Sequence, residues 1–318
     1  MTTAYTKPNQ KTKRLIRKLL ISISVLTLFF LTITLSKEIS TYVLDGLRLA
    51  LKVIIPSVFP FLLITDLFTN NISVEKISPI RKAFEKLFGI SGYAASTFLC
   101  GVLCGFPIGA KMSIELYKNG IISKYECERL MSFCNNASPA YVIFVIGMTL
   151  RSSLYQGMAL YLLMIFSAFF TGVILGTSKQ KNIYKVFIYE QKYSFVSSVQ
   201  RSTEICISIC GFITTFAIIC GLIKRVIKNK LLCGILISFF EIGNASLFLS
   251  DLCIFRPCIS FALTSFCISF SGISVIAQTQ SILGNTHEIS IFNHIKYKFL
   301  QGCISFISAL IVFKIIFV

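Results

Sequence analysis

Two adjacent asparagines are the most chemically versatile residues in a chain that is otherwise strongly apolar. Asn135 and Asn136 stand at the start of an apolar run, with Ser138 and Pro139 directly after them. Two carboxamides supply four donors and several acceptors, and polar groups inside a membrane are costly unless they have partners. Two interpretations remain open: these side chains cap and pair broken backbone, or they hydrogen-bond a polar solute or ion near the midplane.

An isolated glutamate interrupts a second apolar run. Glu241 follows Leu231–Phe240 and precedes Gly243 and Asn244. An intramembrane carboxylate is expensive, so we expect it to be protonated, paired with a cation such as Lys111, or exposed to a water-filled cavity. Glu241 is therefore the first candidate for ion or proton coupling.

Other polar residues are weaker candidates. Gln278 and Gln280 are either polar contacts between helices or part of the lining of a site. Asp66 lies near the end of an apolar run, where the membrane interface is expected. His287 and His294 fall in a polar stretch and are too isolated to indicate a metal, so we expect no metal and no cofactor. The sequence contains none of the common hydrolase, metalloprotease or nucleotide-binding motifs, which predicts that the chain is not an enzyme.

Glycines and prolines interrupt the helices that must position these side chains. Gly101, Gly105 and Gly109 recur every four residues and place bare backbone on one helical face. Pro107 removes a backbone donor in this stretch, so we expect the helix to break there. We also expect Pro56 and Pro60 to break an earlier span. The residues predicted to shape the breaks are Gly101, Gly105, Pro107, Gly109, Pro139, Gly243 and Gly272.

A helix, a turn and a second helix are predicted after the first break. Ser123 with Glu126 three residues later forms a capping box, which predicts a helix over Lys124–Cys134. We expect this pair of helices to lie at a membrane surface, with Glu126, Glu128 and Arg129 on the solvated face.

The composition indicates the class of protein. The 318 residues are 55% hydrophobic and 14% charged, with a mean hydropathy of +0.78. A soluble domain has about 25% charged residues, so a soluble globular protein is excluded and an all-α polytopic membrane protein with broken or re-entrant helices is predicted. Matching breaks in its two halves favour an inverted repeat. The eight to nine hydrophobic segments are expected at 19–35, 43–68, 94–110, 137–150, 158–177, 204–223, 231–250, 257–283 and 299–318.

Charge and cysteine content agree with this class. The formal net charge of +18 lies mainly between apolar runs, where basic residues keep loops cytoplasmic and near anionic lipid. We therefore expect lipid as a partner and no nucleic acid. The twelve cysteines show neither a disulfide framework nor zinc spacing. The expected division of the chain is a basic cytoplasmic N-terminus (1–18), a signal-anchor helix (19–35), a first half (43–177), a basic linker (178–203) and a second half (204–318).

The same segments carry a family resemblance. The runs GFPIGAK (105–111) and NGIISKYECERLMSFCNNASPAYVI (119–143) resemble sporulation integral membrane proteins of the YlbJ type, within the wider nucleoside-recognition Gate-domain group. FEIGNAS (240–246) and SFSGISVIAQTQSI (269–282) look like the family's second-half breaks. The resemblance implies two Gate-like halves and a role in making the spore cortex, in a mother-cell or forespore membrane.

The motif residues define the expected site. Those matching the first family motif are Gly105, Pro107, Gly109, Asn135, Asn136 and Pro139, and those matching the second are Glu241, Gly243 and Gln278. We expect a transporter-like protein of endospore formation that binds or passes a small polar solute. Its expected binding residues are Asn135, Asn136, Ser138, Glu241, Asn244 and Gln278. The alternative is a non-transporting scaffold for cortex-building partners, and further copies of the chain or other sporulation membrane proteins are the protein partners considered.

Overall fold

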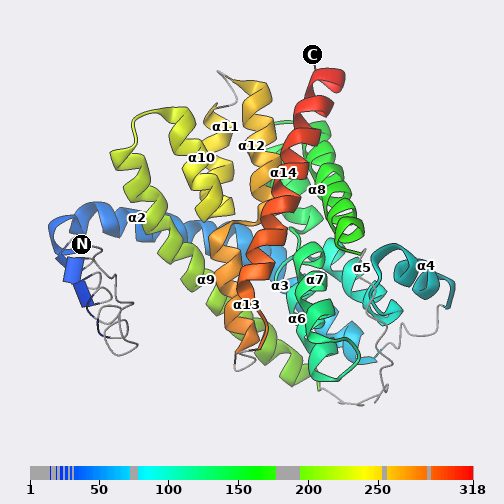
Figure 1. The fold of residues 1–318 in the computed structure, drawn as a ribbon. Helices are drawn as coiled ribbons and strands as arrows, with labels where there is room; N and C mark the ends of the chain where they lie inside the picture. Colours follow the sequence, from blue (N-terminus) through cyan, green and yellow to red (C-terminus); the bar gives the residue numbers. More distant parts are fainter. Residues whose placement is uncertain are drawn as a thin grey trace, which may run out of the picture.

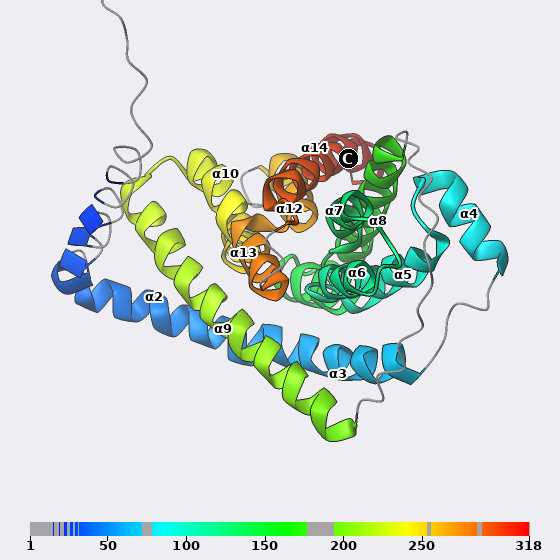
Figure 2. The same cartoon turned by 60° about the horizontal axis from the view of Figure 1, so that its bottom comes forward.

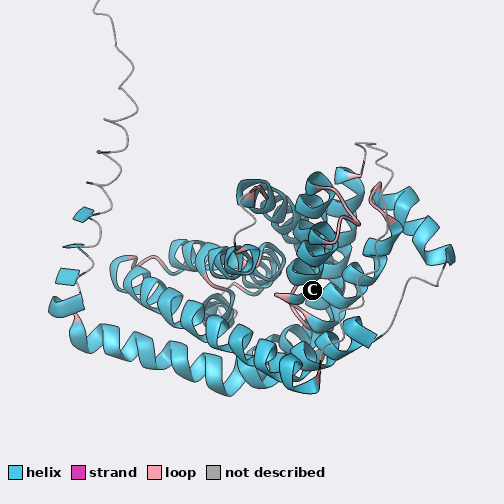
Figure 3. Ribbon diagram, turned by 90° about the horizontal axis from the view of Figure 1, so that it is seen from below, coloured by secondary structure: helices cyan, strands magenta, loops and turns pink. Residues whose placement is uncertain are grey.

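The computed structural model describes residues 32–71, 78–176, 194–252, 256–284 and 288–317, with a few isolated positions between 15 and 30. All regular structure in this part of the chain is helical, as Figure 3 shows. The all-α membrane fold predicted from the composition is therefore confirmed. The expected N-terminal segment, most of the expected signal anchor and residues 178–193 of the expected linker lie outside the described residues.

Fewer helices than expected are long and apolar enough to cross a membrane. Within the described residues there are five, or six if the pair Arg81–Phe88 and Gly92–Cys104, bent by 104°, forms one span. The expected count of eight to nine is not confirmed, because apolar segments such as α5 and α10 form helices of only 10 and 11 residues. The five helices are Ser36–Ile64, Leu154–Leu175, Phe195–Val226, Pro257–Leu283 and Ile291–Ile316.

The two halves of the chain repeat one order of elements. Each has a short helix, a break, a hairpin of two helices, a second break, another short helix and a long helix. In the first half these helices are α5 (Ala95–Cys104), α6 (Ile108–Lys118), α7 (Lys124–Cys134), the π-helix η4 (Ala140–Leu150) and α8 (Leu154–Leu175). In the second half they are α10 (Lys230–Phe240), α11 (Ile242–Leu252), α12 (Pro257–Phe270), α13 (Gly272–Leu283) and α14 (Ile291–Ile316).

The corresponding hairpins lie at opposite ends of the molecule. In Figure 1 the hairpin α6–α7 is toward the bottom and the hairpin α11–α12 toward the top. The second helix of each hairpin packs on the last helix of the other half, α7 on α14 and α12 on α8. This is the arrangement that an inverted repeat produces.

Two long helices form a separate layer across both halves, which we call the crossed layer (Figure 2). One is the continuous run α2 (Ser36–Leu49), π-helix η1 (Ala50–Ile54) and α3 (Ile55–Asn71), and the other is α9 (Phe195–Val226). They cross at Gly46, where an added Cβ would lie 2.8 Å from the Cα of Thr214. Only a glycine therefore permits this close crossing.

The prediction that Pro56 and Pro60 break the first long helix is wrong. The helix continues through both prolines, and Pro60 lies inside α3. A proline ring clashes with the carbonyl four residues earlier in an α-helix. For Pro56 that carbonyl belongs to Lys52, which lies in the π-helical turn Ala50–Ile54. The wider turn accommodates the ring without ending the helix.

A bent connection joins the crossed layer to the first half. The amphipathic helix α4 (Ser78–Phe88) and the 3-10 turn η3 (Gly92–Ala94) precede α5. Phe88 at the end of α4 stacks on Phe133 of α7, with ring centroids 5.2 Å apart. The outer faces of the long helices carry exposed side chains such as Leu162, Ile207 and Ile311, which contact lipid in a membrane.

Candidate functional site

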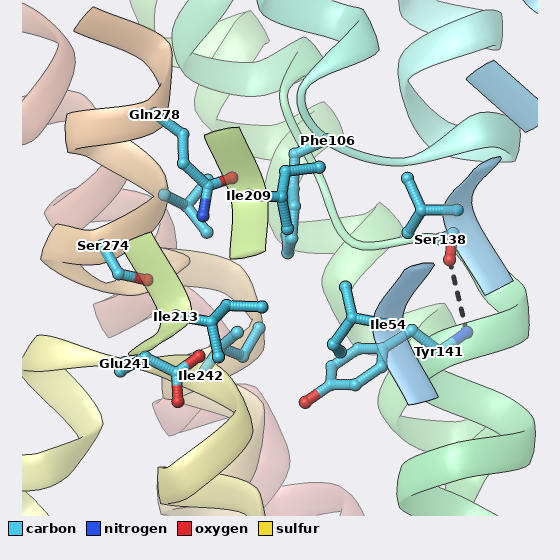
Figure 4. A pocket seen from close by; sticks show the side chains of 12 residues that line it. Ile54, Phe106, Ser138, Tyr141, Ile209, Ile213, Glu241, Ile242, Ser274 and Gln278 are labelled. Carbon is cyan, nitrogen blue, oxygen red and sulfur yellow. Dashed lines mark hydrogen bonds between the residues drawn. The ribbon is translucent and has the colours of Figure 1, made fainter. Parts of the chain in front are cut away.

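The four helix breaks converge on one cavity. Phe106 lies in the break between α5 and α6, Ser138 in the break between α7 and η4, and Glu241 in the break between α10 and α11, while Ser274 is in the first turn of α13 after the fourth break. The crossed layer closes one side with apolar residues of η1, α3 and α9. The cavity volume is about 20 Å³, enough for about one water molecule, within a wider space of about 460 Å³ that includes the open mouth. The polar residues around it, seen in Figure 4, are Ser138, Tyr141, Glu241, Ser274 and Gln278.

Glycines let the first break approach the second. Gly105 has a φ of +85°, and an added Cβ would lie 2.6 Å from the backbone nitrogen of Ser138. A Cβ at Gly101 or Gly109 would overlap the carbonyl oxygen of Cys134. The glycine stripe predicted from the sequence thus faces the end of α7, and Pro107 is the N-cap of α6.

The paired asparagines occupy different surroundings, although both are fully buried. Asn135 Nδ2 donates to Thr279 Oγ1 at 3.1 Å, and its Oδ1 has no hydrogen-bond partner. Asn136 Nδ2 donates to the Phe133 carbonyl at 2.7 Å, while its Oδ1 accepts from Gln301 and Lys298 at 2.9 and 3.3 Å. The amide of Asn136 is therefore engaged within the protein, and neither asparagine lines the cavity.

Ser138 and Pro139 complete the second break. Ser138 Oγ accepts a hydrogen bond from the backbone N–H of Tyr141 at 3.3 Å, and Pro139 is the N-cap of η4. Ser138 also lines the cavity. It is thus the member of this break whose side chain reaches both the local backbone and the candidate site.

Glu241 is buried at the cavity wall and caps the following helix. It is a single extended residue between α10 and α11. Its carboxylate accepts hydrogen bonds from Gly243 N at 2.8 Å, Asn244 N at 2.5 Å and Asn244 Nδ2 at 2.9 Å. The carboxylate thereby satisfies two backbone N–H groups in the first turn of α11. Asn244 also donates its side-chain amide to Glu241 and does not line the cavity. A Cβ at Gly243 would lie 2.6 Å from Leu49 Cδ2.

The fourth break leaves two polar atoms unused. Ser271 and Gly272 both have a φ of +73°, which ends α12 and starts α13. Ser274 Oγ and Gln278 Oε1, four residues apart, are buried, have no hydrogen-bond partner among the described residues and line the cavity. Together they present a hydroxyl group and an amide oxygen from one helical face.

Lys111 forms an ion pair with Asp66, not with Glu241. Lys111 Nζ of α6 and Arg201 Nη2 of α9 each lie 2.5 Å from a different carboxylate oxygen of Asp66 on α3. Burial raises the pKa of Asp66, but hydrogen bonds from Arg201 and Lys111 outweigh it and hold the pKa at about 2. The cluster ties the crossed layer to the first hairpin.

The capping box predicted for α7 is confirmed, but the solvated face is not. Ser123 and Glu126 make both hydrogen bonds of the box. Glu126, Glu128 and Arg129 are 5%, 3% and 0% exposed. Glu128 accepts from the Ser290 N–H and from Asn293 Nδ2, both at 2.7 Å. The charged face of α7 therefore fastens neighbouring segments inside the protein.

Several important residues were missed from the sequence. Lys298 and Gln301 lie in α14 and are fully buried. Lys298 fell outside the expected segment 299–318 because the helix begins at Ile291. His294 is also buried in α14 and does not lie in a polar loop. The spacing of Lys298 and Gln301, one helical turn apart before an apolar run, was the available signal. Across the described part of the chain, no group of three His, Cys, Asp or Glu residues could hold a metal ion.

Comparison with known proteins supports the family resemblance. The chain is similar to the sporulation integral membrane protein YlbJ of Bacillus subtilis (strain 168), with 22% identity over an alignment that covers 85% of this chain and 76% of that protein. The resemblance to YlbJ-type proteins is thus confirmed, and the chain is a multi-pass integral membrane protein. No family model matches the chain, and no solved structure matches it.

Proposed function

We propose that this chain is a transporter-like protein of spore formation that binds a small polar solute in the cavity at the helix breaks. The observation that carries the proposal is the pair of unpartnered atoms at the cavity, Ser274 Oγ and Gln278 Oε1. Leaving a buried polar group without a partner costs about 1–3 kcal/mol. A solute that accepts from the hydroxyl and donates to the amide oxygen removes that cost.

The position of the cavity supports transport over simple binding. It lies where broken helices of two oppositely oriented halves meet, which is where repeat-built transporters bind substrates. Its far wall belongs to the crossed layer, through residues such as Val58 and Ile213. A relative movement of the crossed layer and the two halves would therefore change access to the solute.

The site residues have divided roles in this proposal. Ser274 and Gln278 contact the solute, and Ser138 and Glu241 are further polar residues of the cavity lining. Asn135, Asn136 and Asn244 hold the breaks in shape, since their hydrogen bonds run within the protein. The proposal assigns no catalytic group.

The proposed role in spore formation rests on the similarity to YlbJ, which is named as a sporulation integral membrane protein. The test is a count of heat-resistant spores from a deletion strain of the organism that carries this chain. The strain is complemented at matched protein levels with wild type, Ser274→Ala, Gln278→Leu or Gln280→Leu. Gln280 is the matched control, because it lies on the same helix but is exposed.

Each outcome separates the candidate functions. Transport predicts that wild type and the Gln280 variant restore heat resistance, whereas the Ser274 and Gln278 variants do not. A scaffold for cortex-building partners predicts that all of them restore it. Normal spores in the deletion strain would exclude the sporulation role, and a cortex of normal thickness in electron micrographs of heat-sensitive spores would exclude cortex assembly.

The solute class needs a direct assay. Purified protein in detergent is screened by thermal unfolding against small polar solutes, beginning with nucleosides, the class that the Gate-domain resemblance implies. A ligand raises the unfolding temperature in proportion to its occupancy. The rise should disappear in Gln278→Leu and persist in Gln280→Leu.

A further inference from the structure

A fully buried lysine is held by neutral oxygen atoms at the contact between the two halves. Lys298 on α14 is 0% exposed. Its Nζ donates to Gln301 Oε1 at 2.9 Å, to the Ser269 carbonyl at 3.2 Å and to Asn136 Oδ1 at 3.3 Å. No described carboxylate forms an ion pair with it. The positive charge is thus compensated by oxygen dipoles.

The number of acceptors matches a protonated amine. An ammonium group has three N–H donors and no acceptor, and three oxygens surround Nζ. A neutral amine would turn its lone pair toward one of these oxygens. The nearest titratable neighbours are the thiol of Cys134 on α7 and the imidazole of His294 on α14, and neither supplies a hydrogen-bond acceptor to Nζ. The surroundings therefore suit a monovalent cation.

The oxygens come from positions that favour cations. Ser269, which supplies its backbone carbonyl, is in the last turn of α12. Asn136 lies two residues beyond the end of α7 and supplies its side-chain amide oxygen. The last carbonyls of a helix lack intrahelical partners and carry partial negative charge. The ends of half-helices at membrane breaks bind Na⁺ in other transporters for this reason. Here the amine meets a helix-end carbonyl of α12 and the side-chain oxygen of a residue just beyond α7, the equivalent helix of the other half.

We propose that the Lys298 ammonium occupies a monovalent-cation site built by both halves of the chain, and that removing the lysine side chain converts this place into a Na⁺ site. In the wild-type protein the protonated lysine takes the place of the ion. The wild-type fold is therefore independent of Na⁺. This inference concerns stability and holds whether or not the chain transports a solute.

The test is thermal unfolding of the full-length protein in detergent, in NaCl or in choline chloride at equal ionic strength. The chain has no tryptophan, but cysteines such as Cys127, Cys220 and Cys267 are fully buried. A fluorogenic thiol reagent therefore reports unfolding. The variants are Lys298→Ala, which leaves space for an ion, Lys298→Met, which fills it with an apolar group, and Lys296→Ala, an exposed control on the same helix.

The expected result is specific to one variant. Wild type and Lys296→Ala unfold at the same temperature in both salts. In choline chloride, Lys298→Ala unfolds at a lower temperature than wild type. Na⁺ raises its unfolding temperature by several degrees, and the rise saturates with Na⁺ concentration, as binding to the folded state requires. Lys298→Met also unfolds at a lower temperature than wild type, but Na⁺ does not raise its unfolding temperature. Adding Gln301→Ala to Lys298→Ala removes one ligand and raises the Na⁺ concentration needed for half of the effect.

Three results would overturn the proposal. The first is a specific rise in the wild-type unfolding temperature with Na⁺, because the lysine would then leave a cation site open. The second is a folded Lys298→Ala protein that responds to neither Na⁺, Li⁺ nor K⁺. The third is failure of both Lys298→Ala and Lys298→Ser to fold in Na⁺, since the serine adds a ligand and Na⁺ should rescue both.

Discussion

Replacing Asp66 with asparagine tests how the crossed layer is held on the first hairpin. The Asp66 side chain is 5% exposed, and its cation partners Lys111 and Arg201 are 19% and 29% exposed. The substitution keeps the shape of the side chain but removes the charge that both cations share. We expect Asp66→Asn to fold with lower stability, because two partly buried cations lose their common anion.

The size of the effect follows from the pKa. The structure lowers the pKa of Asp66 from its usual 3.8 to about 2. Each tenfold change in acid dissociation corresponds to about 1.4 kcal/mol, so the ionised group contributes about 2 kcal/mol to folding at neutral pH. For a chain of this size a loss of about 2 kcal/mol lowers the unfolding temperature by about 4 °C.

The pH dependence has a definite sign. Because the pKa of Asp66 is lower in the folded state, its contribution is complete at pH values well above 3.8 and is lost as the pH falls toward about 2. Unfolding temperatures are measured by circular dichroism in detergent at pH 7 and pH 3. The difference in unfolding temperature between wild type and Asp66→Asn should be largest at pH 7 and smaller at pH 3.

Asp45→Asn is the matched control. Asp45 pairs with Arg48 at 3.7 Å, but these side chains are 57% and 68% exposed. An exposed pair of this kind contributes about 0–1 kcal/mol, so the control should unfold close to the wild-type temperature. Two results would refute a stabilising role for ionised Asp66. One is equal stability of wild type and Asp66→Asn at pH 7, and the other is a difference in unfolding temperature that is larger at pH 3 than at pH 7.

Three further substitutions are read by the same unfolding measurement at pH 7. Gly105→Ala should lower the unfolding temperature more than Gly211→Ala. Gly105 has a φ of +85° and a crowded Cβ position, whereas nothing lies within 4 Å of a Cβ at Gly211. Equal effects of the two substitutions would contradict the close approach of Gly105 to Ser138. Ser123→Ala removes the N-cap of α7 and should cost about 1 kcal/mol; an unchanged unfolding temperature would exclude a stabilising cap. Glu241→Gln leaves one side-chain acceptor for three N–H donors and should cost about 1–3 kcal/mol, whereas wild-type stability would show that α11 does not need the carboxylate.

Local features of the fold were predictable from the sequence. The capping box at Ser123 and Glu126 and the break at Glu241 formed where expected, because such features depend on residues only a few positions apart. Gly105 and Pro107 likewise mark a break through their own backbone properties. Pro56 and Pro60 were the exceptions, since the helix continues through both, and at Pro56 a preceding π-helical turn accommodates the ring.

Features that depend on distant segments were not predictable. The charges of α7 indicated a solvated face, but Glu128 is satisfied by Ser290 and Asn293, more than 160 positions further along the chain. Asn136 was predicted to be at the solute site or in a cap, and its partner Lys298 was assigned to no element. One sequence carries no record of which segments meet, so the division between cavity residues and buried supports required the structure.

The packing of α7 on α14 has a consequence for biosynthesis. A chain is made from its N-terminus, so α7 is synthesised well before Lys298 and Gln301. Until then Glu128 and the Oδ1 of Asn136 lack the partners that they have in the finished protein. The last helix therefore completes the first half, and a nascent chain truncated before α14 retains unpaired polar groups. Membrane proteases and chaperones that recognise such groups can distinguish the unfinished chain from the complete one.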